Sequence, residues 1–312
     1  MSWSKRPRTS LAIIDSSAMV SPMKIKTIGI ITKNADQAVS DTVDTLYDFL
    51  TEKSYTLIFD QNAEGLLADK TIDIRSREEL AEKSDLAIVV GGDGTFLSAV
   101  RTLADYNTPV LGINLGRLGF LVDISPDDMI DRLENILSGE YVDDVRFLLH
   151  AEIIRKEKVI GESDAFNDVV VHIRDVARMI EFKTYINGQF VNFQRADGLV
   201  VSTPTGSTAY ALSSGGPLLH ATLDAMVLVP ICPHTLTNRP LVVNSDSKVE
   251  ILIDEKEQST AQVTFDGQTG FDVKPGDRII IKKKANKIHL IHPASYDYYE
   301  ILRAKLSWAR QL

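Results

Sequence analysis

The sequence predicts an α/β domain with an open, mostly parallel, Rossmann-like sheet, followed by an all-β, sandwich-like domain. In the first part of the chain, apolar strand-like runs alternate with helical stretches, which is typical of βαβ units. From Phe147 onward the runs are short, alternate with a period of two and are separated by turn residues, which is typical of an antiparallel sandwich. A length of 312 residues also favours two domains.

Four apolar runs are expected to form the sheet of the first domain, with the sequences TIGIIT, YTLIF, DLAIVV and PVLGIN. The run from Leu86 to Val90 shows no alternation, as expected for a strand that is covered on both faces. Helical spacing of leucine, valine and tyrosine predicts a helix over Ala35 to Lys53, and Arg75 to Lys83 is expected to form another. Both helices would flank the sheet.

The second domain begins with a short helix that we expect over Asp127 to Ser138, and the strand-rich pattern follows it. Asn187-Gly188 joins two alternating runs, and this dipeptide is the strongest short signal for a β-hairpin. Pro275-Gly276-Asp277 predicts a second turn, before a strand over Arg278 to Lys282. The segment from Tyr296 to Ala309 has helical spacing and is expected to return to the first domain.

The expected boundaries are residues 1–22 for a mobile N-terminal extension, 23–125 for the α/β domain, 126–293 for the β domain and 294–312 for the returning C-terminal helix. The start of the chain imitates a signal peptide, but Asp15 interrupts its apolar segment. Met23 stands immediately before the first strand, so both Met1 and Met23 stay open as the native start.

Charge and cysteine content exclude several classes of protein. A net charge of −9 argues against nucleic acid or an anionic membrane as a main partner, since both need a dense Lys/Arg surface. No apolar run reaches the roughly 20 residues that span a bilayer. The single cysteine, Cys232, excludes an intramolecular disulfide and favours the cytoplasm. The six histidines show no metal-ligand spacing, so we expect no metal bound by side chains; Cys232 and His234 are expected to be buried packing residues.

The first glycine cluster is GGDGT, formed by Gly91, Gly92, Asp93, Gly94 and Thr95. It follows a buried strand and precedes a helix expected over Phe96 to Leu103. Ligands of open α/β sheets bind at this position, and the free N–H groups of a helix N-terminus favour anions. Glycines also let the backbone approach a phosphate closely. The alternative is a tight turn in which Asp93 caps the helix.

A second cluster, GINLGRLGF from Gly112 to Phe120, follows the next strand and should line the same crevice. Gly116 and Arg117 are expected in the phosphate region. Arg117 would supply positive charge there, or it would be an ordinary surface arginine. Neither cluster matches the GxxxxGK[ST] loop or the full GxGxxG fingerprint, so no standard nucleotide-binding loop is assigned.

Asp93 is the candidate general base. An aspartate is ordinarily ionised at neutral pH and can accept a proton from a hydroxyl whose oxygen attacks phosphorus. Most of a phosphoryl-transfer barrier is lowered by positioning and by charge neutralisation, which implies a divalent cation with the phosphates.

Two further segments are polar enough to hold a ligand. Asn167-Asp168 offers an amide and a carboxylate that suit sugar hydroxyls, with a simple turn as the alternative. The segment from Asp197 to Gly216, DGLVVSTPTGSTAYALSSGG, is rich in hydroxyl groups and glycine and is expected to present several donors to a ligand. Within it, Tyr210 offers a flat surface for a base.

These residues resemble the NAD kinases, in particular the bacterial branch. The match comprises GGDGT at 91–95, GRLGF at 116–120, the Asn-acidic pair at 167–168, DGLVVSTPTGSTAYALSSGGP at 197–217 and VPICPHTLTNRPLVV at 229–243. The motifs occur in family order and cover nearly everything from Met23 to the C-terminus. The resemblance implies a kinase that transfers the γ-phosphoryl group of ATP to the 2′-hydroxyl of the adenosine ribose of NAD, giving NADP.

The resemblance also implies roles for the matched positions. Asp93 would be the general base at the ribose hydroxyl, and Mg²⁺ would be the expected cation, bound with ATP. The other residues implied at the NAD site are Gly94, Asn167, Asp168, Arg178, Arg195, Asp197, Thr208, Ala209, Tyr210, Ser213 and Gln268. Asp197, preceded by Arg195, would reach the pocket of its own or of a neighbouring subunit, because family members form homodimers or homotetramers. The family usually has glutamate after the asparagine, so Asp168 is one methylene shorter.

Two other functions stay open at this point. A lipid kinase of the diacylglycerol or sphingosine type shares a GGDG element, but the hydroxyl-rich segment and the lack of basic or amphipathic membrane-binding elements count against a lipid substrate. A non-catalytic NADP sensor would keep the pocket without the chemistry, and the intact GGDGT counts against it.

Overall fold

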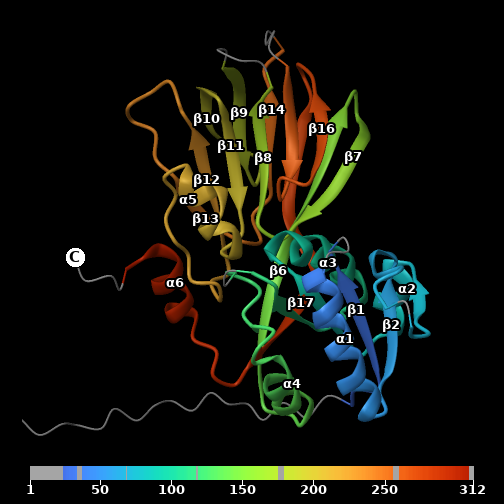
Figure 1. Ribbon diagram of the computed structural model, residues 1–312. Helices are drawn as coiled ribbons and strands as arrows, with labels where there is room; N and C mark the ends of the chain where they lie inside the picture. Colours follow the sequence, from blue (N-terminus) through green and yellow to red (C-terminus); the bar gives the residue numbers. More distant parts are fainter. Residues whose placement is uncertain are drawn as a thin grey trace, which may run out of the picture.

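The computed structural model describes residues 24–33, 37–67, 69–116, 119–174, 179–255 and 260–308. The expected N-terminal extension, Arg117 and Arg178 lie outside these residues. In Figure 1 an α/β domain lies below a β-rich domain, and the strands β6 and β17 run through both.

The first domain is the α/β unit that the sequence predicts. Its elements are β1 (Thr27–Thr32), α1 (Gln37–Glu52), β2 (Thr56–Asp60), η1 (Gln61–Ala63), β3 (Asp73–Arg75), α2 (Arg77–Lys83), β4 (Leu86–Gly91), α3 (Asp93–Tyr106) and β5 (Val110–Asn114). The strands are parallel in the order β5-β4-β1-β2-β3. Of these, the short edge strand β3 carries too little apolar pattern to be found from the sequence.

Helices cover both faces of this sheet, which explains why its strands are continuously apolar. Ile88 of β4 packs with Val43 and Leu46 of α1 on one face. The next residue along the strand, Val89, packs with Val100 and other residues of α3 on the opposite face. Helix α2 begins with a capping box at Ser76.

The second domain is an antiparallel sandwich, also as predicted. Its elements are β6 (Tyr141–Arg155), β7 (Lys158–Ala165), β8 (Asp168–Ile173), β9 (Ile180–Ile186), β10 (Gln189–Ala196), β11 (Gly198–Ser202), η2 (Thr205–Thr208), α5 (Tyr210–Ser213), β12 (Ala225–Ile231), β13 (Leu241–Asn244), β14 (Val249–Ile253), β15 (Ala261–Phe265), β16 (Thr269–Val273) and β17 (Arg278–Pro293). One layer has the order β13-β12-β11-β8-β15-β16, and the other contains β10, β9, β14, β17, β6 and β7. An apolar core from both layers lies between them. At the β9–β10 hairpin Asn187 and Gly188 have positive φ, as expected for that turn.

The two domains share one continuous sheet, which the sequence does not predict. β17 extends well beyond the expected Lys282 and ends at Pro293. Its first part pairs with β14, and its last part reaches β5, where Leu290 pairs in parallel with Val110. The sandwich is therefore joined to the α/β sheet through backbone hydrogen bonds, which fixes the relative position of the two domains.

Two short helices complete the fold. Helix α4 (Met129–Leu137) places Met129, Leu133 and Ile136 in the core of the α/β domain. Helix α6 (Tyr298–Leu306) contacts both domains: Lys305 Nζ lies 5.6 Å from the ring centre of Phe120, and the Tyr298 hydroxyl donates to the carbonyl of Leu219. Within the described ranges, no helix is both long enough and apolar enough to cross a membrane.

Candidate active site between the two domains

Asp93 lies at the first position of α3, immediately after the glycines that end β4. Its carboxylate does not cap the helix. The N-cap position is occupied by Gly92, so no side chain caps this end of α3. Instead Asp93 Oδ2 accepts a 3.0 Å hydrogen bond from the N–H of Phe120, and Oδ1 accepts one of 3.2 Å from Leu121. The two glycine clusters of the sequence therefore meet at this carboxylate.

The loop can approach Asp93 this closely only because residue 119 is glycine. A Cβ atom on Gly119 would stand 2.2 Å from Asp93 Oδ1, well inside contact distance. Gly92 and Gly94 are exposed beside Asp93, while Gly91 is buried at the end of β4. The arrangement leaves an accessible backbone at a helix N-terminus, which suits phosphate oxygens.

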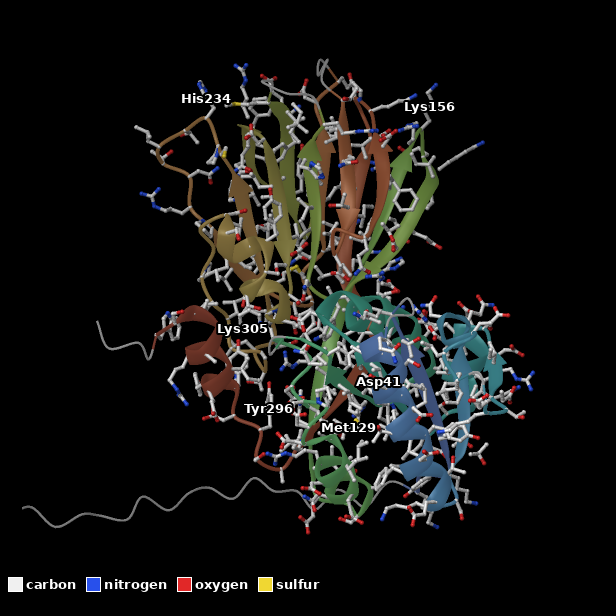
Figure 2. The ribbon with its side chains drawn as sticks, viewed as in Figure 1. Asp41, Met129, Lys156, His234, Tyr296 and Lys305 are labelled. Atoms are coloured by element: carbon white, nitrogen blue, oxygen red, sulfur yellow. The ribbon has the colours of Figure 1, made fainter. Side chains whose placement is uncertain are left out.

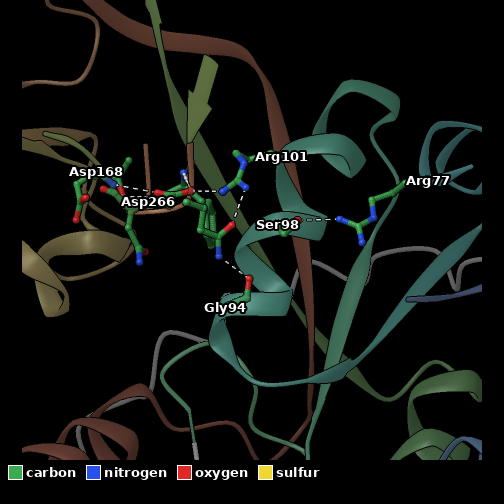
Figure 3. Close-up of polar contacts among 10 residues, drawn as sticks. Arg77, Gly94, Ser98, Arg101, Asp168 and Asp266 are labelled. Atoms are coloured by element: carbon green, nitrogen blue, oxygen red, sulfur yellow. Dashed lines mark hydrogen bonds and ion pairs between the residues drawn. The ribbon is translucent and has the colours of Figure 1, made fainter. Parts of the chain in front are cut away.

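A row of three side chains connects this helix to the second domain (Figure 3). Gln268 donates from Nε2 to the carbonyl of Gly94 at 2.8 Å, and its Oε1 accepts from Arg101 Nη2 at 2.7 Å. Arg101 Nη1 in turn donates to Asp266 Oδ2 at 2.9 Å. Asp266 is fully buried and Arg101 is largely buried, so the pair is shielded from solvent. Charge-assisted bonds of this kind are stronger than neutral ones and hold the two domains in register.

Asp266 also organises the turn that carries the predicted sugar-binding pair. Its carboxylate accepts hydrogen bonds from the backbone N–H groups of Phe166, Asn167 and Asp168, at 3.0, 2.7 and 3.2 Å. This turn also packs closely against Gly206. A Cβ atom on Gly206 would lie only 2.2 Å from the carbonyl oxygen of Asn167. Asn167 and Asp168 thus have fixed positions relative to α3.

Asp168 is buried, and burial raises its pKa from 3.8 to about 7. The nearby Asp266 carboxylate contributes to this rise in the pKa of Asp168, whereas a hydrogen bond from the N–H of Tyr210 lowers the pKa. At neutral pH the carboxyl group exists in both protonation states. It can therefore accept a hydrogen bond from a sugar hydroxyl, or donate one to it.

A cavity of about 430 Å³ opens beside this carboxyl group on the outer face of the six-stranded layer. Its lining residues come from β8, β15, the turn after β15 and the start of α5: Asn167, Asp168, Val170, His172, Ala209, Tyr210, Gln262, Thr264, Asp266 and Gly267. Tyr210 is 45% exposed, so its ring is available to a ligand. The volume and the mixed lining are typical of a small-molecule site.

The hydroxyl-rich segment is only partly what the sequence predicts. Thr203 and Ser207 are fully buried, and their hydroxyls bond to backbone groups of neighbouring turns rather than to open space. Thr205 accepts a 3.0 Å bond from the buried Arg146. The expectation that this stretch presents several donors to a ligand is wrong for these three residues, which shape the loop. Thr208, Ala209 and Tyr210 remain at the surface of the site, and Ser213 is exposed on α5.

Arg195 and Asp197 are not brought to this part of the site. Strands β8 and β11 pair Asp168 with Ser202 and His172 with Gly198, so Asp197 adjoins the opposite end of these strands. At about 3.3 Å per residue, that end is roughly 13 Å from Asp168. Cys232 and His234 lie near that end too, because the N–H of Asp197 bonds to the carbonyl of Ile231 and the N–H of His234 bonds to that of Arg195. Both are exposed rather than buried as predicted, and His234 is labelled in Figure 2.

Replacing Asp168 with asparagine is expected to change how stability depends on pH. Because the folded-state pKa is raised, the folded protein binds more protons than the unfolded chain between about pH 4 and pH 7, and stability falls as the pH rises through this window. From pH 5 to pH 8 the wild type should lose roughly 2–3 kcal/mol more unfolding free energy than Asp168→Asn. Urea denaturation at both pH values measures this difference, and parallel pH profiles for the two proteins would contradict it.

Sequence reasoning missed Arg101 and Asp266, the two residues that join the halves of the site. Asp266 precedes Gly267 and Gln268 in a turn, and this Asp-Gly pair was a usable signal, since aspartate side chains in turns often bond to nearby backbone N–H groups. Arg101 occupies an unremarkable helical position, so only its spatial neighbours reveal its role. His172 and Gln262, which line the cavity, were likewise hidden in strand patterns.

Comparison with known proteins agrees with this geometry. Residues 28–141 match the model of the ATP-NAD kinase N-terminal domain, and residues 166–293 match that of the ATP-NAD kinase C-terminal domain. The chain is 51% identical to an NAD kinase of Nitrosococcus oceani over 294 residues, covering 94% of this chain and 100% of the relative. It is 48% identical to an NAD kinase of Azotobacter vinelandii, covering 92% and 97%.

Two solved structures resemble the fold. An NAD kinase from Archaeoglobus fulgidus in complex with ATP has a TM-score of 0.68 at 26% identity, covering 90% of this chain and 97% of that one. Yeast NADH kinase complexed with NADH has a TM-score of 0.84 at 23% identity, covering 92% and 89%.

Proposed function

Since the chain belongs to the ATP-NAD kinase family, we propose that it transfers the γ-phosphoryl group of ATP to the 2′-hydroxyl of the adenosine ribose of NAD, with Asp93 as general base. The family assignment makes the chain an NAD kinase, an enzyme that phosphorylates NAD to NADP. The proposal concerns the donor, the acceptor hydroxyl and the residues that act on them.

The observation that carries the proposal is the direct linkage between the Asp93 helix and the Asn167-Asp168 turn. The contacts of Gln268 and Arg101 place a glycine-lined helix N-terminus and a sugar-sized polar cavity in one rigid frame. Holding a nucleophile and a phosphate in fixed geometry supplies a large share of the acceleration of phosphoryl transfer. An interdomain site of this kind fits a dinucleotide acceptor and a nucleotide donor together.

In this mechanism the Asp93 carboxylate takes the proton of the 2′-hydroxyl as its oxygen attacks the γ-phosphorus, while the bond from that phosphorus to the β–γ bridging oxygen breaks and ADP leaves. The two backbone N–H groups that bind Asp93 restrict its rotation, so the base needs little reorganisation during the step. Asn167 and Asp168 would hold the ribose hydroxyls, and Tyr210 would stack on a base of the dinucleotide.

The residues present fit a cation that arrives with the nucleotide. Among the described residues, no group of three potential ligand side chains gathers at Asp93, which leaves the phosphates and water as the main ligands, as Mg²⁺ prefers. When bound, Mg²⁺ would neutralise charge on the phosphate oxygens.

Assembly and location form part of the proposal. Asp197 and Arg195 lie beyond the end of β8 that is roughly 13 Å from Asp168, and we propose that they serve a site of a neighbouring subunit in a homodimer or homotetramer. The exposed thiol of Cys232 suits the reducing cytoplasm.

The test is a comparison of acceptors. With ATP and Mg²⁺, NAD should be converted to NADP, whereas dispersed diacylglycerol should not be phosphorylated. Turnover of the lipid without turnover of NAD would overturn the proposal in favour of a lipid kinase.

A further inference from the structure

Strand pairing gathers a group of ligand side chains that the sequence spacing does not reveal. In the β6–β7 hairpin, Glu152 lies directly opposite Glu162, and His150 lies two residues before Glu152 on the same face. The potential ligand atoms of these three side chains all lie within 4.8 Å of one another. The histidine spacing alone predicted no metal ligand, because two of the three partners are carboxylates and one comes from a neighbouring strand.

The two glutamates form an unfavourable pair unless a cation lies between them. Like charges directly opposite each other on antiparallel strands destabilise a sheet. Within the described part of the chain, neither Glu152 nor Glu162 forms an ion pair with a lysine or arginine, although Arg155, Arg278 and Lys284 of the same layer pair with other carboxylates. Within these described residues, no direct ion pair with a lysine or arginine offsets the charge of the two glutamates, although Lys282 lies opposite His150 on β17.

His150 is oriented as metal-binding histidines are. Its Nδ1 lies 2.7 Å from Asp164 Oδ1, which leaves Nε2 as the free ring nitrogen. Histidines that bind metals commonly donate their other N–H to a carboxylate, which fixes the tautomer and raises the basicity of the ligand. Asp164 is itself held by Lys284, which also pairs with Asp105 of α3. This outer layer keeps the imidazole in place.

Space for additional ligands lies next to the cluster. A cavity of about 360 Å³ extends from His150 and Glu162 to α2 and α3. Its other lining residues are Glu78, Arg101, Thr102, Asp105, Tyr106, Ser163 and Asp164. Water molecules there can complete the coordination of an ion that takes three ligands from the protein.

We propose that His150, Glu152 and Glu162 bind a divalent transition-metal ion of the zinc class, at a site separate from Asp93. One imidazole and two carboxylates suit Zn²⁺ and its first-row neighbours, whereas Mg²⁺ and Ca²⁺ prefer oxygen ligands alone. A bound ion offsets the repulsion between the two glutamates and ties both strands of the hairpin together beside α3.

The test is a Zn²⁺ titration of the full, nucleotide-free chain against a chromophoric chelator. The wild type is expected to bind one Zn²⁺ per chain at this site. His150→Gln and Glu162→Gln should each weaken this binding at least about tenfold, and Asp164→Asn, which removes the partner of His150, should weaken it about 10- to 100-fold. Affinity should also fall as the pH is lowered, because protons compete for the imidazole and the carboxylates.

Matched variants separate this site from other zinc ligands and from the kinase site. Glu157→Gln changes a glutamate of the same hairpin that pairs with Arg278 instead, so it should leave Zn²⁺ binding unchanged. Asp93→Asn should likewise bind Zn²⁺ as the wild type does. Circular dichroism confirms that each variant is folded. Absence of Zn²⁺ binding by the wild type at micromolar concentration, or equal binding by the wild type and His150→Gln, would overturn the proposal.

Discussion

Replacing Asp93 with asparagine is expected to reduce NADP formation by at least about 100-fold while NAD still binds. Asparagine has the same shape, but its single acceptor oxygen keeps only one of the two hydrogen bonds from the N–H groups of Phe120 and Leu121, and its amide cannot take up the proton of the attacking hydroxyl. The loss should therefore fall on kcat, with little change in KM for NAD. Initial rates over a range of NAD concentrations, with saturating ATP and Mg²⁺, measure both constants.

Thermal unfolding with and without NAD provides the control for this variant. NAD should raise the Tm of Asp93→Asn as it raises that of the wild type, because ligand binding to the folded state is retained. Turnover equal to that of the wild type would show that Asp93 is not the base. Wild-type protein that bound NAD but formed no NADP would instead favour a non-catalytic NADP sensor.

Replacing Gly119 with alanine is expected to lower kcat about 10- to 100-fold, because the new methyl group would stand 2.2 Å from Asp93 Oδ1. Either the carboxylate or the loop must move, and the hydrogen bonds from Phe120 and Leu121 would be lost or lengthened. A displacement of about 1 Å of a catalytic group is sufficient for an effect of this size. The measurement is again the steady-state rate of NADP formation.

Gly116→Ala is the matched control, three residues away in the same loop. A Cβ atom at Gly116 would meet nothing closer than Asn114 Oδ1, at 3.9 Å, which is ordinary contact. Although Gly116 is expected in the phosphate region, its new methyl group would not displace Asp93, so kcat should fall less than in Gly119→Ala. Equal losses in the two variants would mean that the loop tolerates no side chain for other reasons, and that the close approach to Asp93 does not set the position of the base.

The sequence was sufficient to predict most of the fold. Strands buried on both faces, such as β4, have an unbroken apolar pattern, and the Asn187-Gly188 turn requires positive φ at both residues; these are local properties. The continuation of β17 to Pro293 could not be predicted in the same way. Its pairing with β5 joins Leu290 to Val110, 180 positions apart, and nothing in the local pattern indicates such a partner.

The residues of the candidate site also differ in whether local sequence or long-range contacts reveal them. Asp93, Asn167 and Asp168 stand in motifs whose residue types suggest chemistry, so the sequence alone identified them as candidates. Arg101 and Asp266 act through distant contacts and were not found. The sequence predicted that the hydroxyls of Thr203 and Ser207 contact the ligand. In the structure they form hydrogen bonds with buried backbone groups instead. Composition alone cannot distinguish these two uses of a hydroxyl group.

The measurement that tests the central claim most directly is the fate of the γ-phosphate of ATP. The chain is incubated with NAD, Mg²⁺ and γ-labelled ATP, and the label is located on the product by ³¹P NMR and by an NADP-specific dehydrogenase. The interdomain site predicts that the label appears as the 2′-phosphate of NADP and that the product serves the NADP-specific enzyme. Transfer of the label to another hydroxyl, or no transfer to NAD, would contradict it.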